Sequence, residues 1–176
     1  MKQSLQTAFS CSSFLLSYPE PGWGEALIEL QEEIEAIEQE DVKAALTAFI
    51  KQAQGKTNAQ LIDTYVYTFD FGKKTNMYLT YMNTGEQRER GIELLELKQH
   101  YKKSGFEVTD KELPDYLPLL LEFFANANEQ DSEPIMSKYK ENIQALHVQL
   151  KEADSMYEPI LAAILLAIDT WGVQTN

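Results

Sequence analysis

Residues 65–124 read YVYTFDFGKKTNMYLTYMNTGEQRERGIELLELKQHYKKSGFEVTDKELPDYLPLLLEFF, and this stretch decides how the chain is interpreted. Tyrosines and phenylalanines alternate there with single carboxylates, a tight basic pair follows at Arg88 and Arg90, and prolines alternate with acidic residues in ELPDYLP, residues 112–118. The stretch does not combine a nucleophile, a base and an orienting group, and it has no cluster of metal ligands. This mixture indicates a surface that grips another polypeptide rather than a site of bond chemistry.

Outward from this stretch, apolar residues recur at helical spacing almost throughout the chain, and alternating β-branched runs are nearly absent. A chain of 176 residues is long enough to bury one core without disulfides. The pattern therefore predicts an all-α protein, a single helical domain over residues 1–176, without internal repeats or a clear linker.

Several local signals predict where helices begin. Residues 57–60 and residues 155–158 both have the spacing of a capping box, in which side chains satisfy free backbone donors at a helix start. Pro118 and Pro134 suit the first turns of two further helices, because proline lacks an N–H that would be unpaired there anyway. Residues 126–133 are expected to form a mobile loop before the second of these.

Other signals predict where helices stop. Gly72 is expected to interrupt the helix that passes through Tyr65 and Phe69, before a further helical piece over residues 75–82. Residues 83–85 read as a turn. A long helix over residues 86–104 should then end at Gly105, in the position where a left-handed residue is usual.

Apolar run length and cysteine content indicate the cellular compartment in which the protein works. The longest apolar run, Ile160–Ile168, is shorter than the ~20 residues needed to span a bilayer, so no stable membrane insertion is expected. No signal-peptide core follows Met1, and a lone cysteine, Cys11, fits a reducing compartment. The sequence therefore predicts a cytoplasmic protein in which Cys11 is a small packing residue.

The net charge of −13 argues against nucleic acid as a partner. It favours a basic partner, such as a peptide that carries arginine or lysine. Solubility alone would explain the same charge, so both interpretations stay open.

The residues needed for catalysis or for a bound cofactor are missing from the sequence. Two histidines, His100 and His147, and one cysteine cannot build a closed zinc site. No phosphate-binding glycine loop, dinucleotide fingerprint or nucleophile elbow occurs, and Asp63 and Asp70 lack a second acidic pair that could hold magnesium. We therefore expect no metal, no cofactor and no enzymatic activity.

Taken in order, the motifs of the central stretch resemble those of the nitrate reductase assembly chaperones, or delta subunits, within the wider group of redox-enzyme maturation chaperones. The similar segments are residues 65–71, 74–75, 78–81, 85, 88–91, 105–107 and 112–115. They cover roughly the middle third of the chain, and the flanking helices agree in pattern and length only.

The resemblance implies a helical bundle of the redox-enzyme maturation chaperone type, without turnover. Such a chaperone binds the N-terminal segment of the molybdenum-containing alpha subunit of nitrate reductase. It holds that subunit until molybdenum cofactor and iron–sulfur clusters are in place and before the enzyme docks on its membrane anchor. The family's Glu-x-Pro-Asp-His motif maps onto Glu112, Pro114 and Asp115, but Tyr116 replaces the histidine. A role that needs imidazole protonation is therefore not expected here, whereas hydrogen bonding or stacking is.

A groove for a basic amphipathic peptide needs aromatic anchors and carboxylates at its rim. The candidate peptide-binding residues are Tyr65, Asp70, Tyr78, Tyr81, Arg88, Arg90, Glu112, Pro114, Asp115 and Tyr116.

Alternatives remain for several aromatic and charged residues. Phe69 and Phe71 are expected in the core, and Tyr81 and Tyr116 fit core or groove equally well. Arg88 and Arg90 are expected to pair with Glu86 or Asp115 rather than with a cofactor phosphate. Asp115 either caps the helix that follows it or lies at the rim of the groove.

Three other functions stay open: an all-helical enzyme such as a hydrolase or isoprenoid synthase, an adaptor subunit with a permanent partner, and a chaperone for a different molybdoenzyme.

Overall fold

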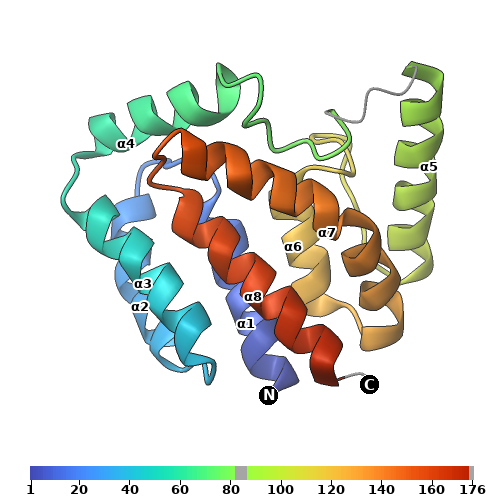
Figure 1. Ribbon diagram of the computed structural model, residues 1–176, viewed down its shortest axis with the longest axis horizontal. Coiled ribbons are helices and arrows are strands. Elements are labelled where there is room, and N and C mark those ends of the chain that lie inside the picture. The colour runs from blue at the N-terminus through green and yellow to red at the C-terminus, as the bar shows by residue number, and fades with distance from the viewer. Residues whose placement is uncertain (82–86, 175–176) are drawn as a thin grey trace.

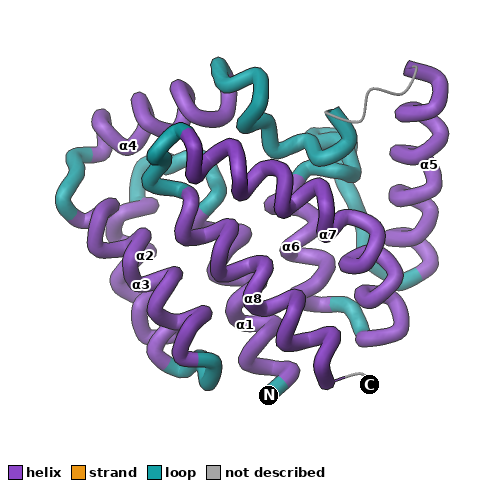
Figure 2. The backbone as a smooth tube through the Cα atoms, in the orientation of Figure 1, coloured by secondary structure: helices purple, strands orange, loops and turns teal. Residues whose placement is uncertain are grey.

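The computed structural model describes residues 1–81 and 87–174, and helices make up most of this part of the chain (Figures 1 and 2). The helices are α1 (Lys2–Leu15), α2 (Trp23–Glu35), α3 (Glu40–Gln54), α4 (Asn58–Tyr65), the π-helical segment η1 (Val66–Asp70), α5 (Gln87–Lys103), α6 (Leu117–Asn126), α7 (Glu129–Glu152) and α8 (Glu158–Gln174). The described residues form no strand, and an isolated antiparallel bridge joins Tyr78 to Tyr116. The all-α prediction is confirmed.

Helices α1 and α8 lie at the centre of the bundle. Helix α1 packs against α6, α8 and α2, while α8 also contacts α3 and α7 (Figure 1). Both central helices carry apolar residues on more than one side, and a helix that is hydrophobic nearly all round is stable only when it is buried. Leu5, Phe9 and Leu15 of α1, with Ile160 and Ile164 of α8, are fully buried.

Cys11 of α1 belongs to this core. Its side chain is fully buried, and that burial, with a smaller effect from the nearby Glu33 carboxylate, raises the pKa of the thiol to about 12. Because the thiolate is the reactive form, Cys11 is an inert packing residue, as predicted.

Several predicted helix ends are confirmed. Thr57 and Gln60 form both hydrogen bonds of a capping box at the start of α4. Pro118 lies in the first turn of α6, and Gly105 follows α5 with a φ of +75°. The capping box predicted at residues 155–158 is wrong, because the Glu158 carboxylate lies 2.7 Å from Nε2 of His147 instead.

The helix start predicted at Pro134 and the loop predicted over residues 126–133 are both wrong. Helix α7 begins at Glu129, where the Asn128 side chain accepts a hydrogen bond from the Asp131 N–H at 2.9 Å. Pro134 therefore lies inside the helix. The N-terminal cap outweighs the proline here, since one missing N–H near the start of a 24-residue helix leaves most of its hydrogen bonds intact.

The helical piece predicted over residues 75–82 is also wrong. Residues 71–81 are irregular, and Met82 and the turn predicted at 83–85 lie outside the described residues. The backbone pairs with a distant segment: Leu117 N–H donates to the Met77 carbonyl at 2.9 Å, and Leu79 N–H donates to the Asp115 carbonyl at 3.2 Å. The Met77 carbonyl and the Leu79 N–H are thereby lost to any local helix.

Segment η1 continues α4 with a wider turn, in which Phe71 N–H donates to the carbonyl of Val66 at 3.1 Å. Phe69 is buried as predicted, at 6% exposed. Phe71, predicted to lie in the core, is 76% exposed, so that prediction is wrong. The Thr75 hydroxyl then donates to the Thr68 carbonyl and closes a tight loop around Gly72.

None of the helices in the described part of the chain is long and apolar enough to span a membrane.

We predict that Gly72→Ala destabilises the protein by about 1–3 kcal/mol, the usual range for overpacking. A Cβ at this position would collide with the Thr68 carbonyl and the Thr75 hydroxyl, and the carbonyl belongs to the backbone of η1. Urea unfolding measures the change. Gly24→Ala is the matched control, because its added Cβ meets nothing within 4 Å; a Gly72→Ala variant as stable as that control would contradict the prediction.

Candidate functional site

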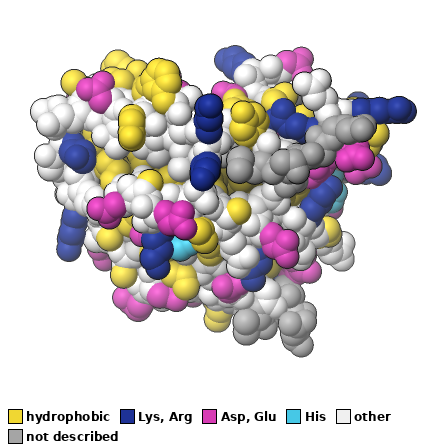
Figure 3. Space-filling model, turned by 45° about the horizontal axis from the view of Figure 1, so that its top comes forward, with side chains coloured by type: hydrophobic (Ala, Val, Ile, Leu, Met, Phe, Trp, Pro, Cys, Tyr) yellow, Lys and Arg dark blue, Asp and Glu magenta, His cyan; other side chains and the backbone are white. Residues whose placement is uncertain are grey.

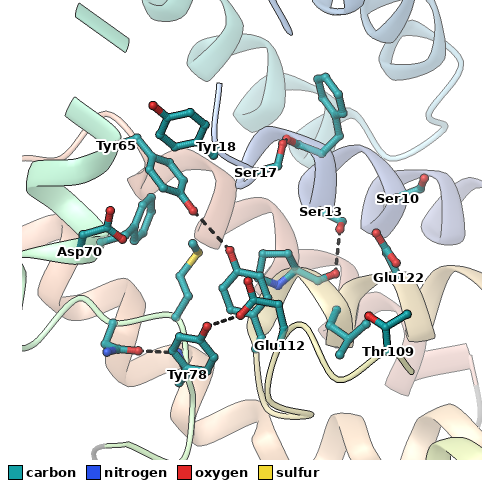
Figure 4. Close-up of a pocket in the computed structure, with 17 residues that line it drawn as sticks. Ser10, Ser13, Ser17, Tyr18, Tyr65, Asp70, Tyr78, Thr109, Glu112 and Glu122 are labelled. Atoms are coloured by element: carbon teal, nitrogen blue, oxygen red, sulfur yellow. Dashed lines mark hydrogen bonds between the residues drawn. The ribbon is translucent and has the colours of Figure 1, made fainter. Parts of the chain in front are cut away.

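A groove of about 760 Å³ opens between α1, the α4–η1 segment, the irregular residues 76–78 and the loop that leads into α6 (Figure 4). We call it the aromatic groove. It is lined by Ser10, Ser13, Phe14, Ser17, Tyr18, Tyr65, Phe69, Asp70, Asn76, Met77, Tyr78, Thr109, Glu112, Tyr116, Pro118, Leu119 and Glu122.

Four tyrosines form the wall of the aromatic groove. The hydroxyls of Tyr65 and Tyr116 lie 3.3 Å apart, and the rings of Tyr78 and Tyr116 lie 5.0 Å apart (Figure 4). Tyr18 packs edge-on against Tyr65 at 5.4 Å. Because each ring packs against another, a ligand that fills the groove would contact apolar side chains that lose little conformational entropy on binding.

Carboxylates lie at the rim of the groove. Asp70, Glu112 and Glu122 are exposed and come from three different segments, and the Tyr78 hydroxyl donates to the Glu112 carboxylate (Figure 4). No lysine, arginine or histidine is among the described residues that line the groove. The rim is therefore negative, and it would attract a cationic group.

Three of the groove tyrosines, Tyr65, Tyr78 and Tyr116, keep their protons at neutral pH. Burial raises the pKa of Tyr65, Tyr78 and Tyr116 above the ordinary value; hydrogen bonds to Tyr116 and Glu112 add to the effect at Tyr65 and Tyr78 respectively. These hydroxyls are therefore uncharged hydrogen-bonding groups on the wall of the groove, and the negative charge belongs to the carboxylates at the rim.

Behind the groove lies a buried carboxylate. Oδ2 of Asp115 accepts hydrogen bonds from the Thr80 N–H at 2.9 Å and the Thr80 hydroxyl at 2.7 Å, and the Arg90 guanidinium lies 3.9 Å from it. Arg90 Nε in turn donates to the Thr80 hydroxyl at 3.0 Å. This cluster ties residues 78–80 to residues 115–117 and so holds Tyr78 beside Tyr116.

Five of the ten predicted site residues line the groove: Tyr65, Asp70, Tyr78, Glu112 and Tyr116. The other five do not. Pro114 is buried, and its carbonyl accepts a hydrogen bond from the Tyr101 hydroxyl at 2.8 Å. Asp115 is fully buried, so its carboxylate is not at the rim, and it does not cap α6 either, whose N-cap is Tyr116.

Tyr81, Arg88 and Arg90 lie away from the groove. Tyr81 is 52% exposed, and the Arg90 guanidinium lies 6.0 Å from the centroid of its ring. The predicted pairing of Arg90 with Asp115 is present, at 3.9 Å. Arg88 is exposed near the start of α5, and Glu86, its other predicted partner, lies outside the described residues.

The sequence prediction left out the contribution of α1. Ser10, Ser13 and Ser17 recur at intervals of three and four residues and bring small polar side chains to one side of the groove, followed by Tyr18. The helical spacing of Ser10 and Ser13 in α1 and Ser17 just after it was a usable signal. Glu122 of α6 had no comparable signal, since a single acidic residue on a helix reads as solvated surface.

Residues 23–163 match the family model described as the nitrate reductase delta subunit. The chain belongs to the nitrate reductase delta subunit family. A delta subunit relative from Bacillus subtilis, named probable nitrate reductase molybdenum cofactor assembly chaperone NarJ, is 47% identical over 97% of this chain and 93% of its own length.

Two less similar relatives have names that also refer to nitrate reductase. The nitrate reductase molybdenum cofactor assembly chaperone NarJ of Escherichia coli is 27% identical over 90% of this chain and 68% of its own length. The nitrate reductase-like protein NarX of Mycobacterium tuberculosis is 32% identical over 93% of this chain, which matches 24% of that longer protein. The two NarJ relatives are named as assembly chaperones rather than as catalysts, which supports the expectation that this delta subunit is not an enzyme. In the described residues, no three histidine, cysteine or acidic side chains are grouped so as to hold a metal ion.

We predict that the free energy of unfolding falls as the pH rises above about 10, the ordinary pKa of tyrosine. Burial is the largest cause that raises the pKa of six tyrosines: Tyr65, Tyr78, Tyr101, Tyr116, Tyr139 and Tyr157. Above pH 10 the unfolded chain releases protons that the folded chain still binds, so the tyrosine contribution is complete below that pH and is lost above it. Urea unfolding at pH 8 and pH 10.5 measures the loss.

Tyr157→Phe is the control for this prediction, because the pKa of Tyr157 is raised by burial alone. The variant should lose less stability than the wild type over the same pH interval. Equal losses in the two proteins would show that other groups carry the alkaline effect.

Proposed function

We propose that this chain is an assembly chaperone that binds the N-terminal segment of the molybdenum-containing alpha subunit of nitrate reductase in the aromatic groove. The observation that carries the proposal is the combination of fixed tyrosine rings with three rim carboxylates and no cation among the described lining residues. A short amphipathic segment that carries lysine or arginine beside apolar side chains complements such a groove.

The two kinds of groove residue would contribute differently to binding. Rim ion pairs between exposed groups are typically worth ~0.2–1 kcal/mol and are screened by salt. An aromatic anchor at the centre of an interface can cost roughly 2 kcal/mol or more when it is truncated. The tyrosines would therefore supply most of the affinity, and Asp70, Glu112 and Glu122 would supply the preference for a basic segment.

In this proposal the chaperone acts before the enzyme is complete. It would hold the alpha subunit in the cytoplasm while molybdenum cofactor and iron–sulfur clusters are inserted, and it would leave before the enzyme docks at the membrane. The relatives from Bacillus subtilis and Escherichia coli are both named as molybdenum cofactor assembly chaperones, which supports a role in cofactor assembly. The cofactor is cargo for the alpha subunit and needs no resident site on the chaperone.

We predict that Tyr78→Ala weakens binding of the alpha subunit's N-terminal peptide about tenfold to thirtyfold, as loss of an aromatic anchor would. Tyr81→Ala is the matched control, since Tyr81 comes from the same segment and is 52% exposed but lies outside the groove. Isothermal titration calorimetry measures both affinities. If the two variants bind alike, the aromatic groove is not the binding site.

We also predict that Glu112→Gln reduces the salt dependence of that binding while leaving most of the affinity in place. One rim carboxylate would be lost, and the tyrosine wall would remain. Titrations at low and high salt measure the slope. Glu29→Gln, an exposed carboxylate on α2, is the control, and an unchanged slope in Glu112→Gln would contradict the rim assignment.

In cells, deletion of the gene should leave the nitrate reductase polypeptides present but inactive and short of molybdenum cofactor. Molybdenum analysis of the purified alpha subunit from nitrate-grown cells measures this. Complementation with Tyr81→Ala should restore cofactor content more fully than Tyr78→Ala. Normal molybdenum content in the deletion strain would refute the proposed role, and capture of a different molybdoenzyme from cofactor-deficient cells would reassign the client.

A further inference from the structure

A second depression, of about 710 Å³, lies on the other side of the α4–η1 segment from the aromatic groove. Tyr67 and Phe71 line it together with Lys56, Lys73 and Lys74, and we call these five residues the lysine–aromatic face. The loop between α7 and α8 forms its other wall, with Glu152 and Asp154. Figure 3 turns this part of the molecule forward, and hydrophobic side chains lie beside lysine or arginine side chains in its upper region.

The aromatic residues of this face are unusually open. Tyr67 lies in η1 and is 79% exposed. Phe71 directly follows η1 and is 76% exposed. Among the described residues these two have the highest exposed fractions of the large hydrophobic side chains, and two such aromatic residues lining one depression indicate an interaction surface. The tight loop at Gly72, closed by the hydrogen bond from Thr75 to Thr68, fixes Phe71 and the two lysines that follow it.

The charge of the face is opposite to that of the groove. Lys56, Lys73 and Lys74 are exposed, and none of them forms a salt bridge to any residue within 1–81 or 87–174. Three lysines against two carboxylates make this a local reversal of sign in a chain whose net charge is −13. An acidic ligand would meet these cations without first having to displace an internal partner.

One helical segment separates the two surfaces. Tyr65, Phe69 and Asp70 line the aromatic groove, whereas Tyr67 and Phe71 line the lysine–aromatic face. A ligand in one depression therefore leaves the side chains of the other available. The two sites can be occupied at once, by segments of opposite charge.

From this arrangement we infer that the lysine–aromatic face is a second docking site, and that its occupant is an acidic amphipathic segment of another protein. Such a segment would place apolar side chains on Tyr67 and Phe71 and carboxylates on Lys56, Lys73 and Lys74. Charge complementarity selects this occupant over the basic segment proposed for the groove. The inference is independent of the identity of the groove ligand.

The test uses two designed peptides and the full-length chain. One peptide is a 15-residue helix with leucine and phenylalanine on one face and glutamate on the flanks; the other carries lysine in place of every glutamate. Wild-type protein should bind the glutamate peptide, and the double variant Lys73→Glu/Lys74→Glu should weaken that binding about tenfold. Tyr67→Ser/Phe71→Ser should weaken it by at least as much. All four positions are exposed, so the variants should remain folded, which circular dichroism would check.

Each outcome bears on the inference. Unchanged affinity in both double variants, or no binding of the glutamate peptide to wild type, would overturn it. The lysine peptide should be insensitive to these variants and sensitive to Glu112→Gln, so a failure of the groove proposal would appear in that peptide alone. Sedimentation of the free protein distinguishes a second copy as the occupant: a dimer that Lys73→Glu/Lys74→Glu dissociates would overturn the assignment to another protein.

Discussion

The buried carboxylate of Asp115 is the contact on which the groove depends. Its two hydrogen bonds to Thr80 join segments that are 35 residues apart in the chain, and neither segment is helical at that point. A buried carboxylate is stable only when its hydrogen bonds or charge are satisfied. Arg90 of α5 supplies the nearby positive charge and also donates a hydrogen bond to the Thr80 hydroxyl, so α5 also contacts this cluster. Together with the backbone hydrogen bonds of Leu79 and Leu117 across the same two segments, this cluster holds Tyr78 against Tyr116.

The same contact explains which residues touch solvent. Asp115 and Pro114 face inward, so their neighbours Glu112 and Tyr116 are left at the groove. The two acids of this motif therefore have different roles: Asp115 supports the structure, and Glu112 lies where a ligand can reach it. The sequence analysis named both acids as candidate groove residues and kept helix capping as the alternative for Asp115, and neither role of Asp115 matches its buried position.

Helix positions were predictable from the sequence where the signals were local. Apolar periodicity located the helices, and the Thr57 capping box, Pro118 and Gly105 marked ends that the structure confirms. The failures come from interactions at longer range or from competing local signals. Residues 75–81 pair with a segment about 40 residues away, which no local pattern reveals, and at residues 126–134 the Asn128 cap outweighed Pro134. For the site, the aromatic and acidic content of residues 65–116 identified five of the 17 residues that line the groove. The contribution of α1 depended on tertiary packing of a helix some 50 residues earlier.

The π-helical turn at Val66–Asp70 has a consequence for how these surfaces tolerate changes in chain length. A π turn contains one residue more than an α turn, so it takes up an extra residue locally, whereas a residue added to a regular α-helix rotates everything after it by about 100°. Removal of one residue between Val66 and Asp70 would restore α geometry and leave Phe71, Gly72 and the lysines on nearly the same side of the axis relative to Tyr65. The acidic groove and the basic face can therefore keep their places when the turn between them gains or loses a single residue.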